Sequence, residues 1–384
     1  MDLKRVGGPL PAVPSDPVLL AAIRDEIEAT GPMTFARFME IVLYDPARGY
    51  YRGIDARPGR AGDFLTAPEA DPIFGRTIAR FARAVHVAIG APGTFTIREY
   101  GAGTGALAAP LAAELLTGEQ PPLAIEYLVA EIEPARVEDV RRALAAVTGA
   151  TVEADDGRPI DGLVIGNEIL DALPTHRVVR RGALLREILV GLGPDGGLAD
   201  AEADPSTPAL AARLEADGVD LTDGQHAEIC LAVDDWLARA AAGLTRGAMV
   251  LIDYGYPAAE LYDPRLRAAG TLATYFGHQV AGDPYRSLGF QDVTAHVDIS
   301  AVQRSATAAG LDHLGTTNQT DFLARLGIGE LLVQEQTRAG ANLQAYLETR
   351  SALIRMIDPA AMGRFRVMVF GRGLEPGRRL PGLA

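Results

Sequence analysis

Three glycines at alternate positions, Gly101, Gly103 and Gly105, follow the acidic residue Glu99. The apolar and β-branched residues before them predict a strand, and the alanine- and leucine-rich run 106–116 behind them predicts a helix. Glycine suits such a turn because it adopts positive φ and lets a ligand approach the backbone with no Cβ in the way. We therefore predict a strand, a tight ligand-binding turn and a helix, with a turn that binds nothing as the alternative.

A second carboxylate favours a nucleoside ligand at this turn. The apolar run 124–130 ends at Glu131, as the second strand of a βαβ unit does, and a carboxylate there can accept hydrogen bonds from both ribose hydroxyls. Dinucleotide-binding proteins space their glycines G-x-G-x-x-G around a pyrophosphate, whereas here the glycines alternate and follow Glu99, which would repel a pyrophosphate. S-Adenosylmethionine carries an ammonium and a sulfonium, so we predict it as the cofactor and keep NAD as the alternative. The expected binding residues are Glu99, Gly101, Gly103, Gly105 and Glu131.

Polar residues directly after a later apolar run indicate where a reaction takes place. Residues 162–166 predict a core strand, and Asn167, Glu168 and Asp171 follow at the edge of the sheet where open α/β proteins bind ligands. If this segment turns helically, the three side chains lie on one side. We predict that they form the acceptor site, with His176 as a further proton acceptor; a helix cap with acidic first-turn residues is the alternative.

Two other segments are candidates for contact with the cofactor. Thr66 and Pro68 stand before a predicted helix that runs to about residue 89, and their loop is expected to close over the cofactor. Helix capping explains the same residues. Asp155 follows a short predicted strand, 150–154, and is expected to contact the adenine amino group, although a plain Asp-Asp-Gly turn explains it equally well.

The composition excludes several kinds of chemistry. Lys4 is the only lysine in 384 residues, so neither a P-loop lysine nor a Schiff-base lysine in the core is available. The single cysteine, Cys230, excludes an intrachain disulfide, and the six histidines are scattered, so we expect no metal site. A net charge of −14 argues against a nucleic-acid partner, and no apolar run reaches membrane-spanning length. The N-terminal residues resemble neither a signal peptide nor an arginine-rich presequence, so we expect a cytoplasmic protein.

The remaining patterns place these residues on an α/β scaffold. We predict helices over 16–29 and 34–43, a β-hairpin over 175–190 and a loop over 191–208. Further helices are expected over 226–242, which would contain Cys230, and over 329–356. We divide the chain into an N-terminal helical cap, residues 1–92, and a Rossmann-like domain, residues 93–384, with insertions at about 175–225 and 256–298.

Taken together, these stretches resemble the MidA family of methyltransferases, whose mitochondrial members assist the assembly of respiratory complex I. Ala102 stands where many relatives have proline, a change that should leave cofactor binding intact. The stretches that carry the resemblance are Gly31-Pro32-Met33-Thr34-Phe35, Tyr44-Asp45-Pro46, Gly49-Tyr50-Tyr51, Gly62-Asp63-Phe64, Thr66-Ala67-Pro68-Glu69, residues 99–105, residues 167–174, Asp253-Tyr254-Gly255 and residues 291–298.

The resemblance implies a mostly parallel class I methyltransferase sheet of seven strands with an N-terminal helical cap and an inserted substrate region. It implies an S-adenosylmethionine-dependent enzyme that methylates arginine in a protein substrate, a complex I subunit in the mitochondrial members. A non-catalytic assembly chaperone that keeps the cofactor fold and an NAD-dependent oxidoreductase are the alternatives. The sequence does not determine the oligomeric state.

Overall fold

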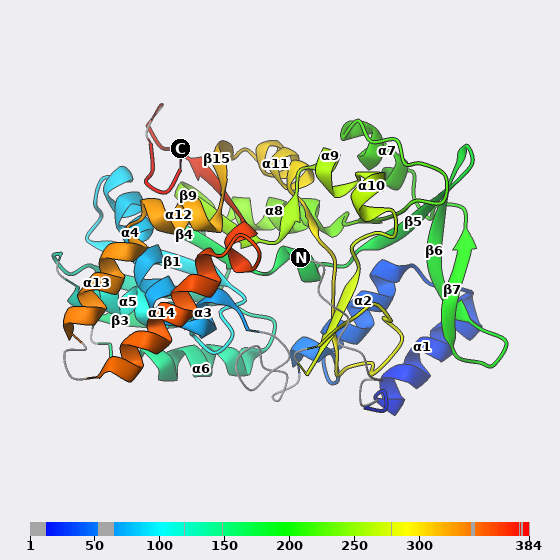
Figure 1. The fold of residues 1–384 in the computed structure, drawn as a ribbon, viewed down its shortest axis with the longest axis horizontal. Helices are drawn as coiled ribbons and strands as arrows, with labels where there is room; N and C mark the ends of the chain where they lie inside the picture. Colours follow the sequence, from blue (N-terminus) through cyan, green and yellow to red (C-terminus); the bar gives the residue numbers. More distant parts are fainter. Residues whose placement is uncertain are drawn as a thin grey trace.

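The computed structural model describes residues 13–52, 65–118, 120–147, 149–277, 279–338, 342–375, 377 and 379–383. The molecule is elongated, with a large α/β core at one end and the N-terminal helices and smaller sheets at the other (Figure 1). Gly62-Asp63-Phe64, which carries part of the family resemblance, and the N-terminal residues 1–12 lie outside the described residues.

The core is a seven-stranded sheet in the order β15-β16-β9-β4-β1-β2-β3. The five strands from β9 to β3 are parallel to one another, and β16 runs antiparallel to both of its neighbours, β9 and β15. This confirms the predicted mostly parallel sheet of seven strands. The strands are β1 (Thr94–Tyr100), β2 (Ala124–Ala130), β3 (Ala150–Ala154), β4 (Ile160–Asn167), β9 (Leu244–Asp253), β15 (Asp312–Asn318) and β16 (Arg366–Arg372).

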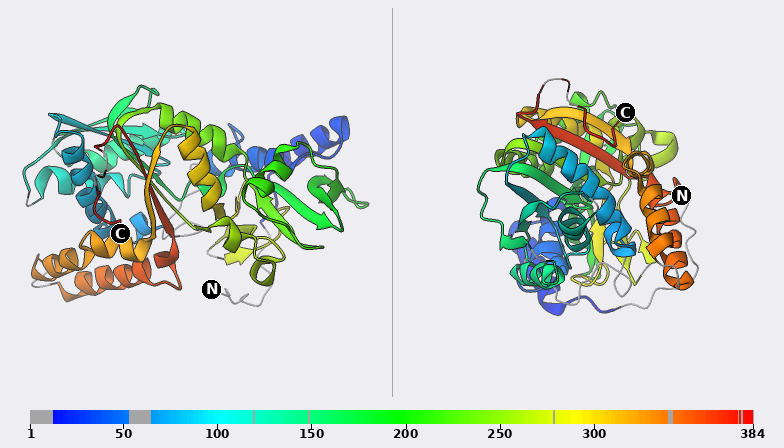
Figure 2. Two further views of the ribbon diagram at one scale, coloured as in Figure 1. Left: turned by 90° about the horizontal axis from the view of Figure 1, so that it is seen from above. Right: turned by 90° about the vertical axis from the view of Figure 1, so that its left-hand side faces the viewer.

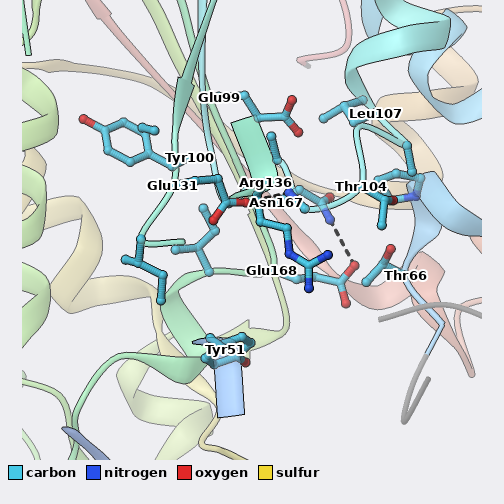
Figure 3. A pocket seen from close by; sticks show the side chains of 18 of the residues that line it. Tyr51, Thr66, Glu99, Tyr100, Thr104, Leu107, Glu131, Arg136, Asn167 and Glu168 are labelled. Carbon is cyan, nitrogen blue, oxygen red and sulfur yellow. Dashed lines mark hydrogen bonds between the residues drawn. The ribbon is translucent and has the colours of Figure 1, made fainter. Parts of the chain in front are cut away.

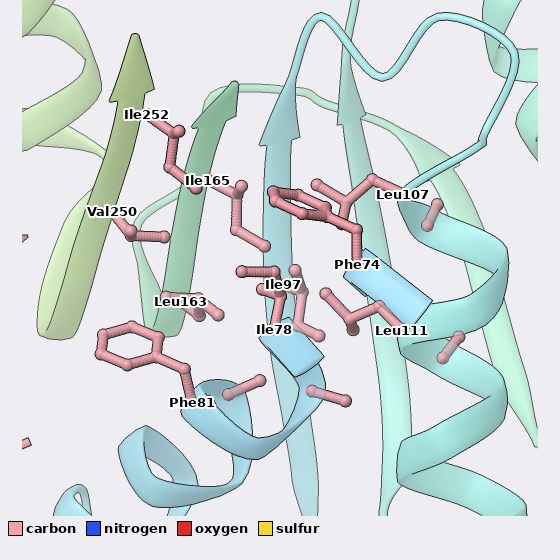
Figure 4. Packing of buried hydrophobic residues seen from close by; sticks show 14 of the residues in the cluster. Phe74, Ile78, Phe81, Ile97, Leu107, Leu111, Leu163, Ile165, Val250 and Ile252 are labelled. Carbon is pink, nitrogen blue, oxygen red and sulfur yellow. The ribbon is translucent and has the colours of Figure 1, made fainter. Parts of the chain in front are cut away.

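Alternating side chains of the strands pack under helices on both faces of the sheet. On one face, Ile97 and Leu163 lie beneath α4 (Ile73–Ala88) and α5 (Ala108–Thr117), which contribute Phe74, Ile78 and Leu111 (Figure 4). On the other face, Val164 and Met249 pack under α8 (Ala232–Ala242) and α11 (Ile299–Ala308). Because parallel strands end at one edge, β1, β2, β4 and β9 deliver the residues that follow them to the same side of the core.

The N-terminal helices α1 (Pro17–Thr30) and α2 (Phe35–Tyr44) agree with the predicted helices to within one residue. The side chains of Asp16 and Thr34 accept hydrogen bonds from first-turn N–H groups and so cap the two helices. Their buried faces form a separate core with Val190, Leu288 and Val293, far along the chain. The inserted sheets therefore hold the N-terminal helical region in place.

The first insertion is a four-stranded antiparallel sheet in the order β7-β6-β5-β8. Strands β5 (His176–Arg181) and β6 (Leu184–Leu192) form the predicted hairpin. The prediction of a loop over 191–208 is wrong where β7 (Leu198–Ala203) pairs with β6, and α7 (Ala209–Ala216) follows. The prediction of a helix from residue 226 is also wrong at its start, because β8 (His226–Ile229) pairs with β5 and sheet pairing overrides helical spacing.

The second insertion and the C-terminal region complete the structure. The predicted single helix over 329–356 is wrong, since α13 (Ile328–Arg338) ends and α14 (Leu343–Ile357) begins at Asn342, whose side chain accepts a hydrogen bond from the N–H of Ala345. The two helices run side by side (Figure 2). The division into two domains stays a prediction. The other elements are η1 (Tyr50–Arg52), α3 (Ala67–Ala70), α6 (Pro134–Leu144), η2 (Leu170–Ala172), β10 (Gly255–Tyr256), α9 (Ala258–Leu261), α10 (Pro264–Arg267), β11 (Ala273–Phe276), β12 (Gln279–Ala281), β13 (Asp292–Thr294), β14 (Val297–Asp298), α12 (Gln319–Arg325) and η3 (Met362–Arg364).

Candidate active site

A cavity of about 230 Å³ opens at the carboxyl ends of β1, β2 and β4. Its wall combines the glycine turn, the end of β4, the α3 segment and residues from the N-terminal helices (Figure 3). The predicted site residues in this wall are Thr66, Pro68, Glu99, Gly101, Gly103, Glu131, Asn167 and Glu168. The structure therefore brings together eight of the twelve residues selected from the sequence.

The glycine turn has the backbone conformation that its residue types require. Gly101, Gly103 and Gly105 have φ of +67°, +54° and +81°, a region that residues with a Cβ rarely adopt. A Cβ at Gly103 would meet nothing within 4 Å, so this backbone faces open space in the cavity. Gly105 is not part of the cavity wall. It faces α6, where an added Cβ would lie only 2.9 Å from the Cβ of Ala143. Gly105 thus allows the turn to pack on α6.

Two carboxylates flank the turn. Glu131 accepts a hydrogen bond from the N–H of Gly103 at 2.6 Å, and burial raises the pKa of its carboxyl. Glu99 is buried and accepts a hydrogen bond from the Tyr127 hydroxyl. Burial, together with the nearby charge of Glu131, raises the pKa of Glu99 to about 8. The two carboxylates favour positive charge and hydroxyl donors next to the turn and disfavour a phosphate there.

The end of β4 places two polar side chains in the cavity through a strained backbone. Glu168 has φ of +53°, and a non-glycine residue in this region persists only where its surroundings hold it. Asn167 Nδ2 donates a hydrogen bond to Glu168 Oε1 at 3.0 Å, while the buried Asn167 Oδ1 has no partner among the described residues. Burial, and secondarily the charge of Asp171, raises the pKa of Glu168 to about 8, although the N–H of Ala67 donates to its carboxylate.

Asp253 holds this unusual turn from the end of β9. Its Oδ2 accepts hydrogen bonds from the backbone N–H groups of Ile169 and Leu170 at 3.1 and 2.8 Å and, more weakly, from that of Asp171 at 3.4 Å. The predicted helical turn with Asn167, Glu168 and Asp171 on one side is therefore wrong, because the chain reverses at Glu168 before a single 3₁₀ turn. Asp171 is buried next to Tyr254 and does not line the cavity.

The remaining sequence candidates lie outside the cavity. Asp155 accepts a hydrogen bond from Arg98 Nε at 2.8 Å and one from the N–H of Gly157 at 3.3 Å, which favours the turn over an adenine contact. His176 lies 2.8 Å from Glu187 through Nδ1, within the inserted sheet. Cys230 is a free thiol between β8 and α8. Among the described residues, no group of three or more His, Cys, Asp and Glu side chains is arranged to hold a metal ion.

Several residues of the wall were not predicted from the sequence. The rings of Tyr44 and Tyr51 stack with centroids 5.6 Å apart, and those of Tyr100 and Trp236 meet edge to face at 5.1 Å. Tyr100 directly precedes the first glycine, and Trp236 is the only tryptophan, so both offered a signal. Glu69, Ile132 and Arg136 also line the cavity. The sequence pattern around Glu69 is that of a helix cap, and this pattern gives no indication that the side chain also lines the cavity.

Comparison with known proteins identifies the family. Residues 77–317 match the model of a family described as putative S-adenosyl-L-methionine-dependent methyltransferases. The chain belongs to this family. It is the MidA family that the sequence motifs indicated. S-Adenosylmethionine is therefore the cofactor, and the NAD alternative is wrong.

Relatives and solved structures extend the similarity over most of the chain. The mouse and rat relatives, each named protein arginine methyltransferase NDUFAF7, mitochondrial, are 28% identical over 95% and 84% of this chain and 86% and 77% of their own. A structure from Burkholderia thailandensis, described as a COG1565 superfamily member and "likely methyl transferase" bound to S-adenosylhomocysteine, is 35% identical with a TM-score of 0.85. That similarity covers 93% of this chain and 92% of the other.

The names of the relatives correct one expectation. We expected a cytoplasmic protein, and this is wrong on the comparison, because the mouse and rat relatives are named as mitochondrial proteins. Within the described part of the chain, no helix combines the length and the apolar character needed to cross a membrane.

The residues that line the cavity of this MidA-family protein fit S-adenosylmethionine. The open backbone at Gly103 leaves room that a side chain would fill, and the Glu131 carboxylate faces the same space as a hydrogen-bond acceptor. Glu99 matches a positively charged group, and Ile132 presents a partly exposed apolar side chain that suits the face of a base.

Proposed function

We propose that this methyltransferase transfers a methyl group to a guanidinium nitrogen of arginine in a protein substrate. The observation that supports the proposal most strongly is Glu168, held at φ +53° with its carboxylate in the wall of the cofactor cavity. The unpartnered Asn167 Oδ1 beside it is a second acceptor for an N–H donor. The names of the relatives agree with an arginine acceptor.

The proposed roles follow from the charge of arginine. When bound, S-adenosylmethionine supplies an activated methyl group on a sulfonium. The guanidinium arrives charged, because its pKa of about 12.5–13.8 lies far above neutral pH. Glu168 binds one edge of it through charge-assisted hydrogen bonds, and Asn167 Oδ1 accepts from a neighbouring N–H. As the new N–C bond forms, the leaving proton passes from the same nitrogen to the Glu168 carboxylate, whose raised pKa suits a proton acceptor near neutral pH.

We propose Glu99, Gly101, Gly103 and Glu131 as the cofactor-binding residues and Asn167 and Glu168 as the catalytic residues. Thr66 and Pro68 are proposed to close the cavity above the cofactor. Asp171 and His176 are no longer included, because neither lines the cavity. Gly105 and Asp155 are assigned to the packing of the turn and to the ion pair with Arg98.

We further propose that the substrate is a subunit of respiratory complex I. The support is the family resemblance together with relatives named NDUFAF7. The experiment incubates the purified protein with isotopically labelled S-adenosylmethionine and purified complex I from cells that lack the enzyme. Mass spectrometry should find labelled methylarginine on one subunit with the wild-type protein. The Glu168→Gln variant should leave the subunit unlabelled while binding S-adenosylhomocysteine normally.

Two outcomes would contradict the proposal in different ways. Labelled methyl groups on lysine or on a carboxylate would refute the arginine acceptor. Normal complex I assembly supported by the Glu168→Gln variant, without any methyl mark, would favour the non-catalytic chaperone instead. Label on arginine of an unrelated protein would refute only the complex I assignment.

A further inference from the structure

We infer that Glu69 is the second carboxylate of the acceptor site and binds the substrate guanidinium together with Glu168. The inference rests on the proposed arginine acceptor and extends it to a residue that neither the glycine turn nor the end of β4 provides. Glu69 belongs to α3, so the acceptor site is built from two segments about a hundred residues apart in the sequence.

Glu69 faces the cavity with one oxygen engaged and one available. Its Oε2 accepts a hydrogen bond from the Thr66 hydroxyl at 2.9 Å and a weaker one from the Thr66 N–H at 3.4 Å. No described residue donates to Oε1. The side chain is half-buried and lines the same cavity as Glu168. One carboxylate oxygen is therefore fixed in orientation while the other remains free for a ligand.

Within the described part of the chain, Arg136 brings a positive charge to the cavity wall, but its guanidinium forms a salt bridge with Asp139 on α6 and its charge acts on Glu131 at the cofactor end. Neither Glu69 nor Glu168 forms a salt bridge there, whereas other carboxylates in the same part of the chain pair with arginine, as Asp155 does with Arg98. Burial raises the pKa of both carboxyl groups, and the charge of Glu69 contributes to the shift at Glu168. Two like charges in one cavity repel each other, so a cation with donors on two edges would relieve the repulsion. A guanidinium has this shape and charge.

Two tyrosine rings complete a site for a planar cation. Tyr44 and Tyr51 line the same cavity as stacked rings, and their hydroxyls are held by the Ala172 carbonyl and the Asp292 carboxylate. The rings are therefore fixed in place and present apolar faces. A guanidinium can pack against a ring face while its N–H groups reach carboxylates. Figure 3 shows Tyr51 on the opposite side of the cavity from Glu99, which belongs to the cofactor end.

Helix capping alone also explains why a glutamate stands at position 69. Thr66 and Glu69 form a capping box at the start of α3. Glutamine serves equally well in such a box, so Glu69→Gln keeps the cap and removes only the charge. This substitution separates the two roles. A purely structural Glu69 predicts no effect of Gln on the binding of a cation.

The test measures the binding of two synthetic ligands by calorimetry. Both carry the adenosyl and amino-acid groups of the cofactor; one bears an ethylguanidinium in place of the methyl group, and the other bears the uncharged urea of equal shape. The wild-type protein should bind the guanidinium ligand roughly 100-fold more tightly than the urea ligand, because each charge-assisted contact contributes about tenfold. Glu69→Gln and Glu168→Gln should each reduce this ratio about tenfold, and the double variant should abolish it.

The controls separate this inference from the proposed function. S-Adenosylhomocysteine should bind all variants with equal affinity, and Glu138→Gln, which removes an exposed charge on α6, should keep the wild-type ratio. A reduced ratio in Glu168→Gln with an unchanged ratio in Glu69→Gln would overturn the role of Glu69 and leave the arginine acceptor standing. A wild-type protein that does not distinguish the two ligands would overturn both.

Discussion

Replacing Glu131 tests how the cavity binds the nucleoside part of S-adenosylmethionine. The carboxylate already holds the Gly103 N–H at 2.6 Å and lies at the end of β2, where it can accept from two ribose hydroxyls. A hydrogen bond to a charged acceptor contributes about 1.5–3 kcal/mol, so losing two costs about 3–6 kcal/mol. Burial raises the pKa of Glu131, which means that the charged carboxylate is costly to keep in the cavity. Alanine removes this cost together with the hydrogen bonds, so we expect the lower end of the range for Glu131→Ala.

The expected change is a roughly 100-fold weaker affinity, since 1.4 kcal/mol corresponds to tenfold in Kd. Glu131→Gln keeps one acceptor oxygen and should weaken binding by about tenfold. The assay is calorimetric titration with S-adenosylhomocysteine at fixed pH. Glu138→Gln is the matched control, because this side chain is 62% exposed and, among the residues that the structure describes, pairs with Arg141 alone. Its Kd should stay within about twofold of wild type, as expected for a surface pair.

A specific result would refute this reasoning. If Glu131→Ala binds S-adenosylhomocysteine with the wild-type Kd and unfolds at the wild-type temperature, Glu131 does not contact the ribose. A lower unfolding temperature with unchanged affinity would show instead that the carboxylate only orients the glycine turn through the Gly103 N–H.

Further predictions concern the turn, the acceptor site and the core. Gly103→Val should abolish calorimetric binding of S-adenosylhomocysteine while far-ultraviolet circular dichroism stays that of a folded protein, because the side chain would fill open cavity space. At saturating cofactor, kcat/KM for the protein substrate should rise with pH up to about 8 and then level, since Glu168 must lose its proton to bind the cation; Glu168→Gln should remove this rise. Arg98→Met should lower the free energy of unfolding in urea by about 3–5 kcal/mol, because Asp155 loses its buried partner; an unchanged midpoint would contradict this. Asp253→Asn should lower turnover and also stability by about 1–3 kcal/mol, because an amide N–H would face backbone donors; full activity would show that the turn does not depend on them.

The residues that we propose for cofactor binding could be selected from the sequence because their signals are local, and the structure places most of them in one cavity wall. Glu99 lies near the end of β1, the alternating glycines follow that strand directly and Glu131 follows β2, so all of them fall within about thirty residues next to two strands whose apolar pattern is plain. Parallel strands then bring these residues to one edge without further information. The sheet of seven strands follows from the same patterns and from the family resemblance.

The acceptor half could not be predicted because distant contacts determine it. The turn after β4 depends on Asp253, whose carboxylate binds N–H groups 82 to 84 positions earlier in the chain. Local spacing therefore suggested a helix and placed Asp171 beside Glu168. Tyr44 and Tyr51 come from the N-terminal helices, and nothing near them in the sequence indicates a cavity.

The secondary structure of residues 226–229 is also determined by a distant contact. Their spacing fits the start of a helix, and only the free edge of β5 turns them into a strand. The edge is made by a hairpin almost fifty residues earlier. Secondary structure at such positions is decided by the partner strand, so a pattern read from one segment does not determine it.

The packing of the N-terminal helices has a consequence for synthesis of the chain. Their core needs Leu288 and Val293, and the Ser287 hydroxyl donates a hydrogen bond to the Val13 carbonyl 274 positions earlier. At roughly 5–20 residues per second, a ribosome needs about 14–55 s to make the intervening residues. During that interval the core that α2 shares with α1 and β6 lacks Leu288 and Val293, and the ring of Phe38 lacks its edge-to-face contact with Tyr285. The cavity wall at Tyr51, whose hydroxyl donates a hydrogen bond to the Asp292 carboxylate, therefore takes its final form only after residue 292 has been made.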